Sequence, residues 1–416
     1  MALVKKPVTG MKDILPSEMQ IRDYVIRVIK ETYGKFGFNT IETPCVENIG
    51  NLNSKNGGEN EKLIFKILKR GEKLNLETAR EELDLVDGGL RYDLTVPLVR
   101  FFSNNGNNLP SPFKALQIGP VWRADRPQRG RYRQFYQCDI DILGEPSNLA
   151  EIELILATTT TLGKLGFKGF QIRINERRIL KAMAAYSGFP EESYDLVFII
   201  LDKMDKIGLD GVADELIKEG FEKESVDKYL SLFKGMEAAE SRLEYVADKI
   251  KDFLDEDIKN NLKEIIDSVS ATKSSDFEII FDPTLVRGMS YYTGTIFEIA
   301  IPEFGGSCGG GGRYDKMVGQ FTGKDTPACG FSIGFERIVL LLMENGFKVP
   351  DENKKIAYLI EKGVSGDSLC RIVAKAQEAR KDGTQVLVAR MNKNKKFQKE
   401  NLTNEGYTEF VEFYKN

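Results

Sequence analysis

Two stretches of alternating apolar and polar residues, joined by a polar turn, lie near the middle of this 416-residue chain. One covers residues 115–118 and the other residues 135–143. A period of two is typical of β-strands whose faces have different environments. We therefore expect a hairpin over 113–144. Its second strand has an apolar face of Tyr136, Cys138, Ile140 and Ile142 and a polar face of Gln137, Asp139 and Asp141.

Other patterns before residue 170 predict shorter elements. Apolar residues recur at helical spacing over 17–36, and a second helix is expected over 150–162. Residues 38–43 read as a strand that ends before Pro44, and residues 62–76 as a hairpin around a turn at Arg70–Gly71. Residues 90–100 read as an extended segment on which Asp93 and Thr95 point the same way.

The remaining chain changes character twice. Residues 170–276 are rich in Lys and Glu at helical spacing, with helices expected over 201–217 and 226–253. A strand restarts at Phe277, and residues 354–416 read as β-α-β-α-β. The chain is therefore predicted to fold as four segments, over residues 1–169, 170–276, 277–347 and 352–416.

Composition narrows the class of protein. Hydrophobic residues make up 41% and charged residues 29% of the chain, as in globular proteins, and no apolar run approaches the ~20 residues that cross a bilayer. The N-terminus lacks the apolar core of a signal peptide. The five cysteines are scattered without a C-x-x-C pair, which favours reduced thiols and a cytoplasmic location.

The chain contains no histidine. This excludes Ser-His-Asp triads, a histidine general base and histidine metal ligands. Any chemistry has to use carboxylates, arginines, lysines, tyrosines or a bound cation. The absence is consistent with a protein that handles histidine and does not depend on it for its own synthesis, or with deliberate removal.

The turn between the two predicted strands is strongly cationic. It carries five arginines against one acid, Asp125, and the arginines are Arg123, Arg126, Arg129, Arg131 and Arg133. Guanidinium groups form bidentate bonds with phosphate oxygens, so this loop is a candidate phosphate site. The plainer interpretation is a solvated basic turn.

These residues, R-A-D-R-P-Q-R-G-R-Y-R-Q-F followed by an acidic strand, resemble motif 2 of class II aminoacyl-tRNA synthetases, in the form found in histidyl-tRNA synthetases. Three further stretches extend the resemblance. Residues 285–292, L-V-R-G-M-S-Y-Y, and 309–315, G-G-G-G-R-Y-D, resemble the two histidine-specific signatures. Residues 328–341 resemble motif 3, and residues 17–44 resemble motif 1 of the dimer interface.

The resemblance implies an α+β fold. An antiparallel-sheet catalytic domain would be formed by residues 1–169 and 277–347, interrupted by a helical insertion, and residues 352–416 would form a short α/β anticodon-binding domain. It also implies a cytoplasmic homodimer that joins L-histidine to tRNA(His) through histidyl-adenylate, with ATP as substrate and Mg²⁺ on its phosphates. No protein ligand of the metal can be assigned. Lys393, Lys395, Lys396 and Lys399 are the expected RNA-facing cluster.

Site residues follow from the matched motifs. The resemblance implies two catalytic arginines, Arg123 and Arg287, at the α-phosphate, and an ATP site of Arg123, Asp125, Arg131 and Arg337. It implies a histidine site of Asp93, Thr95, Gln137, Asp141, Arg287, Tyr292 and Tyr314. In that site Asp93, Thr95 and Gln137 would hold the amino group, Asp141 would accept an imidazole N–H, and the two tyrosines would face the ring's other edge.

Plainer interpretations compete with some of these roles. Asp93 and Thr95 are also good helix caps before the apolar run 96–99. Arg337 could pair with a structural acid such as Glu336. At the level of the whole protein, the alternatives are a non-catalytic paralogue that regulates histidine biosynthesis and an RNA-binding sensor on a degenerate synthetase fold. The first would lack the C-terminal domain and lose ATP-site arginines, and the second would carry a signalling domain.

Overall fold

The computed structural model describes residues 3–53, 62–286, 291–350 and 354–415. The chain divides into two compact units. The larger unit comprises residues 1–13 and 25–342, and the smaller unit comprises residues 14–24 and 343–416.

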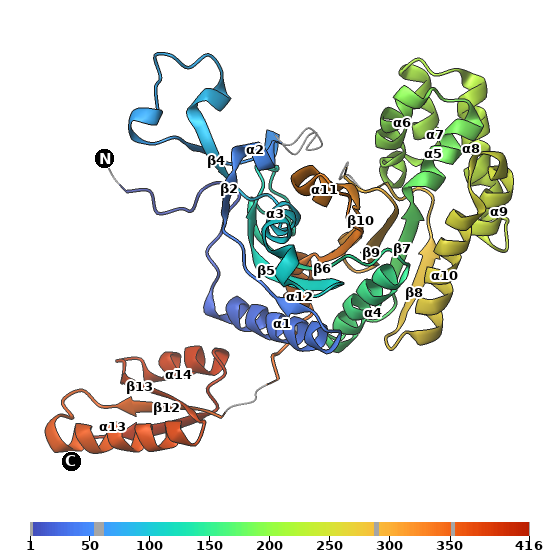
Figure 1. Ribbon diagram of the computed structural model, residues 1–416. Coiled ribbons are helices and arrows are strands. Elements are labelled where there is room, and N and C mark those ends of the chain that lie inside the picture. The colour runs from blue at the N-terminus through green and yellow to red at the C-terminus, as the bar shows by residue number, and fades with distance from the viewer. Residues whose placement is uncertain (1–2, 54–61, 287–290, 351–353, 416) are drawn as a thin grey trace. The chain divides into compact units, whose positions relative to one another are not determined.

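An eight-stranded sheet forms the centre of the larger unit (Figure 1). Its strand order is β1-β5-β6-β11-β10-β9-β7-β8. The five inner pairings are antiparallel, and the two edge pairings, β1 with β5 and β7 with β8, are parallel. The strands are β1 (Asn39–Thr40), β5 (Phe113–Trp122), β6 (Gln134–Leu143), β7 (Phe170–Glu176), β8 (Phe277–Phe281), β9 (Thr295–Ile301), β10 (Gly306–Arg313) and β11 (Ala328–Ile333).

This sheet confirms the predicted fold class and the predicted hairpin, which is β5 paired with β6. Strand β11 lies between β6 and β10, so residues from three distant parts of the chain become neighbours. Helix α4 packs against β6 and β11, and α3 packs against α11. Helices outside the insertion include α1 (Pro16–Lys35), α3 (Thr95–Asn105), α4 (Leu149–Lys164), α11 (Lys316–Thr322) and α12 (Phe335–Glu344).

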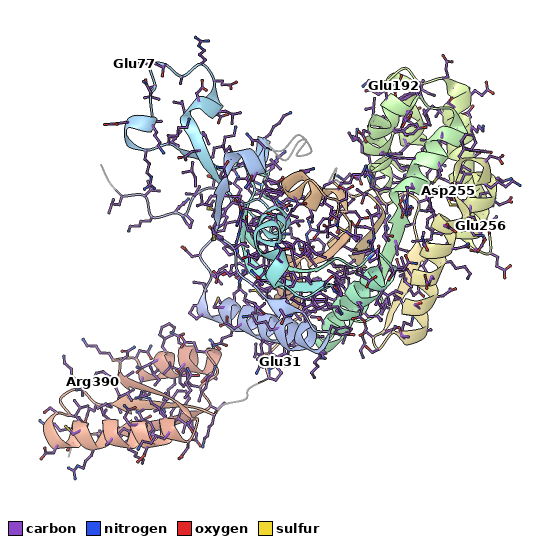
Figure 2. The ribbon with its side chains drawn as sticks, viewed as in Figure 1. Glu31, Glu77, Glu192, Asp255, Glu256 and Arg390 are labelled. Atoms are coloured by element: carbon purple, nitrogen blue, oxygen red, sulfur yellow. The ribbon has the colours of Figure 1, made fainter. Side chains whose placement is uncertain are left out.

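Six helices occupy the chain between β7 and β8: α5 (Arg177–Ser187), α6 (Tyr194–Leu201), α7 (Met204–Lys218), α8 (Lys223–Glu237), α9 (Arg242–Lys249) and α10 (Glu256–Thr272). Helices α5–α9 gather beyond one end of β7 (Figure 1). The single helix predicted over 226–253 is interrupted between Glu237 and Arg242, so the segment forms two helices, α8 and α9. Gly208, with φ +70°, kinks α7. Charged side chains such as Glu192, Asp255 and Glu256 are exposed on this segment (Figure 2).

A small sheet contains β2 (Val46–Asn48), β4 (Val86–Leu90) and β3 (Lys66–Leu68), with α2 (Ile49–Leu52) beside it. The predicted hairpin over 62–76 is wrong, since β3 pairs with β4 instead. Gly71 does turn the chain, with φ +60°, but most of the residues after it are polar and exposed. Leu74 and Leu76 would share a face of such a strand, but Leu76 is exposed and no strand forms between Gly71 and β4.

The smaller unit contains the predicted β-α-β-α-β order: β12 (Lys355–Ile360), α13 (Gly366–Lys381), β13 (Gln385–Arg390), α14 (Lys395–Asn404) and β14 (Glu409–Phe413). Its parallel sheet has the order β13-β12-β14. Alternate residues of β12 face opposite helices. Tyr358 belongs to the apolar cluster with α13, and Leu359 to the cluster with α14.

Candidate active site

A cavity of ≈ 370 Å³ opens in the larger unit, lined largely by β6, β9, β10 and β11 and by the turn between β5 and β6. Every predicted site residue that the structure describes lines it: Asp93, Thr95, Arg123, Asp125, Arg131, Gln137, Asp141, Tyr292, Tyr314 and Arg337. Arg287 lies outside the described residues. Seven separate stretches of sequence therefore meet around one volume.

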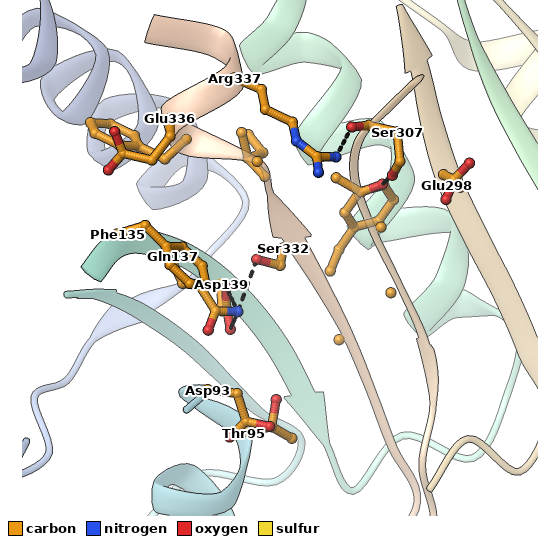
Figure 3. A pocket seen from close by; sticks show the side chains of 18 of the residues that line it. Asp93, Thr95, Phe135, Gln137, Asp139, Glu298, Ser307, Ser332, Glu336 and Arg337 are labelled. Carbon is orange, nitrogen blue, oxygen red and sulfur yellow. Dashed lines mark hydrogen bonds between the residues drawn. The ribbon is translucent and has the colours of Figure 1, made fainter. Parts of the chain in front are cut away.

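Asp93 and Thr95 lie where helix α3 begins, at one end of the cavity (Figure 3). Thr95 is the first residue of the helix, so the extended conformation expected there is wrong. Asp93 combines the two interpretations given above. Its Oδ1 accepts a hydrogen bond from the backbone N–H of Val96 over 3.0 Å, as a cap does. Its Oδ2 is buried and has no hydrogen-bond partner among the described residues.

A buried glutamine fixes this segment to the sheet. The Nε2 of Gln117, on β5, donates to the backbone oxygen of Leu94 over 3.0 Å, and its Oε1 accepts from the hydroxyl of Thr43 over 3.2 Å. Because Leu94 lies between Asp93 and Thr95, this bond holds both cavity residues in place. Burial raises the pKa of the Asp93 carboxyl, against the opposing effects of the Val96 N–H and of Arg123.

Asp141 and Tyr314 form a buried pair deeper in the cavity. The Tyr314 hydroxyl donates to Oδ1 of Asp141 over 2.6 Å. Oδ2 of Asp141 is buried and finds no partner in the described part of the chain. Burial raises the pKa of Asp141 to about 7, although the Tyr314 hydroxyl lowers it. Tyr314, expected to face the ring's other edge, has its hydroxyl on Asp141.

The cavity contains residues that the sequence analysis did not assign to the site. Tyr291 stands between the two chosen tyrosines, with its ring centroid 4.9 Å from that of Tyr292 and 6.0 Å from that of Tyr314. Asp139 and Ser332 also line the cavity. The alternation along 135–143 already put Asp139 on the polar face with Gln137 and Asp141, so that signal was available. Nothing local distinguished Ser332.

The glycine run on β10 lets strands approach closely. A Cβ on Gly311 would stand 1.9 Å from the backbone oxygen of Gly330, and one on Gly312 would stand 2.6 Å from that of Thr295. Gly330 is equally constrained, because its Cβ would meet Oδ1 of Asp141 at 2.0 Å. The bare backbone of these glycines thus makes room for the neighbouring strands and for Asp141.

The other end of the cavity is cationic. Arg337, near the start of α12, donates to the backbone oxygen of Ser307 (Figure 3). Its guanidinium carbon lies 5.2 Å from the centre of the Phe304 ring. Glu336 accepts a hydrogen bond from the backbone N–H of Tyr136 over 3.0 Å.

The cationic turn closes against this arginine. Backbone hydrogen bonds of 2.9 and 3.1 Å join Arg131 and Gln128, and Gly130 takes φ +68° between them. A Cβ on Gly130 would meet Cγ of Arg337 at 3.2 Å, so Arg131 is held beside Arg337. Arg123 is fixed separately, donating from Nε to the Tyr92 backbone oxygen over 2.8 Å with its guanidinium 5.3 Å from the Phe135 ring centre.

The cavity therefore has the acceptors of Asp93, Gln137 and Asp141 toward one end and the guanidinium groups of Arg131 and Arg337 toward the other. Arg123 lies between them, close enough to Asp93 to lower the pKa of its carboxyl. Such a site suits a ligand with a cationic or N–H-bearing part and an anionic part. Within the described residues, no group of three or more Cys, Asp or Glu side chains is arranged to hold a metal ion. None of the described helices is long and apolar enough to cross a membrane.

Comparisons with known proteins show which family the whole chain resembles. A family model described as histidyl-tRNA synthetase matches residues 10–338. A histidine–tRNA ligase from Leifsonia xyli is 48% identical over 81% of this chain and 80% of its own length. A crystal structure of histidyl-tRNA synthetase from Nostoc superposes with a TM-score of 0.77, at 26% identity, over 97% of this chain and 90% of that one.

A further solved structure, from Bacillus halodurans, is described as an ATP phosphoribosyltransferase regulatory subunit/histidyl-tRNA synthetase. It has a TM-score of 0.76, covers all of both chains and is 17% identical, which speaks to the fold alone. The fold is that of a class II aminoacyl-tRNA synthetase. The family model that matches residues 10–338 and the 48% sequence identity to a histidine–tRNA ligase show the family within that class. The chain belongs to the histidyl-tRNA synthetase family.

Proposed function

We propose that the protein joins ATP and L-histidine into histidyl-adenylate in this cavity and then transfers histidine to the 3′ end of tRNA(His). The observation that carries the proposal is one volume with buried acceptors at one end and arginines at the other. Membership of the histidyl-tRNA synthetase family supports the same reaction.

The α-ammonium group of histidine is assigned to Asp93, Thr95 and Gln137. Oδ2 of Asp93 and Oε1 of Gln137 are both buried acceptors without a partner among the described residues. An ammonium group only donates hydrogen bonds and carries the charge that complements Asp93. Because buried acceptors without partners are costly, these two atoms indicate a ligand with N–H groups.

The imidazole ring is assigned to Asp141, with Tyr292 and Tyr314 as the walls beside it. Oδ2 of Asp141 offers a third unpartnered acceptor, suited to a ring N–H. A pocket that bonds a substrate N–H rejects analogues lacking it by about 10⁴–10⁵, so discrimination does not need a separate editing step.

ATP is assigned to the cationic end. Arg123 would contact the α-phosphate, and Arg131 and Arg337 the γ-phosphate, with Arg337 also against adenine. Asp125 sits in the same turn. Mg²⁺ would enter with ATP. The phosphate oxygens of ATP would hold the ion, which would supply positive charge against them.

The reaction suits a protein without histidine. An oxygen of the substrate carboxylate attacks the α-phosphorus, and the bond from that phosphorus to the pyrophosphate oxygen breaks. The carboxylate is already ionised, so no protein base is required. The protein contributes orientation and fixed positive charge, with Arg123 and Arg287 as the proposed catalytic residues. The tRNA hydroxyl then attacks the acyl carbon and AMP leaves.

Assembly and RNA contact complete the proposal. The resemblance of residues 17–44 to motif 1 supports a homodimer, and the five free cysteines suit the reducing cytoplasm. The smaller unit, with its small α/β fold, is proposed to bind the anticodon. Its lysine cluster is partly engaged, since Lys395 and Lys399 both pair with Glu412, so Lys393 and Lys396 are the better candidates for RNA contact.

The test is ATP–pyrophosphate exchange with each of the twenty amino acids, followed by charging of tRNA(His). We expect exchange with histidine alone and charging of tRNA(His). Exchange with a different amino acid would overturn the assignment of the pocket. Absence of exchange with any amino acid would favour the regulatory or sensor alternative.

A further inference from the structure

Gln137 presents its side-chain amide in one orientation. Its Nε2 lies 3.2 Å from Oδ2 of Asp139 and 3.4 Å from Oγ of Ser332, and it donates to both (Figure 3). Its Oε1 is buried and has no partner among the residues described. The amide therefore directs its donor end to the sheet and leaves its acceptor end for a ligand of the cavity.

Two facing strands supply the groups that hold this orientation. Asp139 on β6 and Ser332 on β11 are directly opposite each other in the sheet. The Ser332 hydroxyl also bonds to the Asp139 carboxyl and lowers its pKa, against a larger rise caused by burial. The Ser332 hydroxyl uses its one proton on Asp139, so toward Gln137 its oxygen can only accept, and at least one oxygen of the Asp139 carboxyl accepts in either protonation state. Turning the Gln137 amide over would place its oxygen against these acceptors.

The orientation matters for the proposed substrate. An ammonium group needs acceptors, so the amide oxygen attracts it and the amide nitrogen would repel it. Neither Asp139 nor Ser332 has to touch the substrate for this, because both act on the far end of the Gln137 amide. Asp93 supplies a charged acceptor at the same site through its unpartnered Oδ2.

We propose that Asp139 and Ser332 are positioning residues that fix the Gln137 amide with its oxygen toward the cavity, so that the site selects substrates bearing an α-ammonium group. This inference rests on the proposed function, since it assumes that histidine binds here. It assigns the buried acid Asp139 a role in selecting the amino group, separate from the role of Asp141 at the ring.

The experiment compares two ligands that differ only in the amino group. Dissociation constants for L-histidine and for 3-(imidazol-4-yl)propanoate are measured by calorimetry with the full-length protein, for wild type, Asp139→Ala and Ser332→Ala. We expect histidine to bind about tenfold or more weakly to Asp139→Ala, and less so to Ser332→Ala, while the propanoate binds as before. The matched control is Ser187→Ala, which removes a buried hydroxyl bonded to Met183 outside the cavity and should change neither constant.

A rescue variant separates positioning from damage. Glutamate at position 137 presents an oxygen in either orientation, so Gln137→Glu in the Asp139→Ala background should restore histidine binding. Equal weakening of both ligands in both alanine variants, or failure of the rescue, would overturn the inference. Lack of histidine-dependent exchange by the wild type would instead reject the proposed function, so the two failures are distinguishable.

Discussion

The hydroxyl of Tyr314 donates a 2.6 Å hydrogen bond to Oδ1 of Asp141, 173 positions earlier in the chain. The bond occupies one carboxyl oxygen of this cavity-lining residue and leaves Oδ2 buried without a partner among the described residues. Tyr314 thereby determines which atom of Asp141 is offered to a substrate.

Removing the Tyr314 hydroxyl should leave the Asp141 side chain without the hydrogen bond that fixes its orientation. For Tyr314→Phe we expect the KM for histidine to rise about tenfold while the KM for ATP is unchanged, because a buried hydrogen bond to a carboxylate contributes about 1.5–3 kcal/mol. Steady-state exchange kinetics measure both constants. Asp141→Ala should lose histidine binding and keep ATP binding, whereas parallel loss of both ligands would indicate a folding defect.

The raised pKa of Asp141 predicts a pH-dependent stability. The pKa of the Asp141 carboxyl is about 7 in the folded protein, whereas its ordinary value, expected in the unfolded chain, is 3.8. The folded protein therefore binds this proton more tightly than the unfolded chain does. The contribution of Asp141 to stability is complete below about pH 4 and declines as the pH rises through 7. Asp141→Asn, which stays neutral, should therefore gain stability relative to wild type as the pH rises from 5 to 8, by up to about 3 kcal/mol, because about two pH units of the decline lie between pH 5 and the folded pKa.

Urea unfolding of both proteins at the two pH values measures that difference. Asp93 and Asp139 also have raised carboxyl pKa values, and Asp141 contributes to that of Asp139. The difference between the two proteins therefore also includes the easier ionisation of Asp139 once Asp141 is neutral. A difference in unfolding free energy between Asp141→Asn and wild type that stays constant from pH 5 to pH 8 would mean that Asp141 does not titrate in this range.

Arg287 is assigned from its motif alone. Arg287→Ala should reduce histidine-dependent pyrophosphate exchange by orders of magnitude, because a fixed guanidinium at the α-phosphate stabilises charge that develops in the transition state. Arg178→Ala, which removes a half-exposed arginine paired with Glu176, is the matched control and should retain exchange. Near-normal exchange by Arg287→Ala would reject its role.

A buried ion pair between Arg313 and Glu151 anchors the residue that precedes Tyr314. Arg313, next to Tyr314, bonds to both carboxylate oxygens of Glu151 on α4, over 2.6 and 2.7 Å. Glu151 is 1% exposed. Glu151→Gln should lower the free energy of unfolding by about 1.5–3 kcal/mol, because Arg313 loses its charged partner on α4 and keeps Asp315 and the backbone oxygens of Glu145 and Ser147. Asp267→Asn, which breaks the exposed pair with Lys263, should cost less than about 1 kcal/mol in the same urea titration.

Local sequence patterns predicted much of the fold. The alternation around the arginine-rich turn gave β5 and β6, because a strand with two different faces records its environment in its own residues. The same reasoning failed for residues 62–76. There the partner of β3 is β4, about twenty residues later, and no alternation within residues 62–76 records that pairing.

The sequence predicted the site residues that lie within the matched motifs. It did not predict the residues that reach the site only because elements distant in the sequence pack together. Asp93, Gln137 and Asp141 followed from matched residues. Ser332 reaches Gln137 only because β11 lies beside β6, and Glu151 reaches Arg313 only because α4 packs on the sheet. Such contacts between distant segments leave no periodic signal in the sequence.

The most direct measurement is a crystal structure of the protein with a non-hydrolysable histidyl-adenylate analogue, the sulfamoyl adenosine of L-histidine. The account predicts an imidazole N–H within about 3 Å of Oδ2 of Asp141, the ammonium group on Asp93 and Gln137, and adenine against Arg337. An imidazole ring bound away from Asp141, or an adenosine outside the arginine end of the cavity, would contradict it.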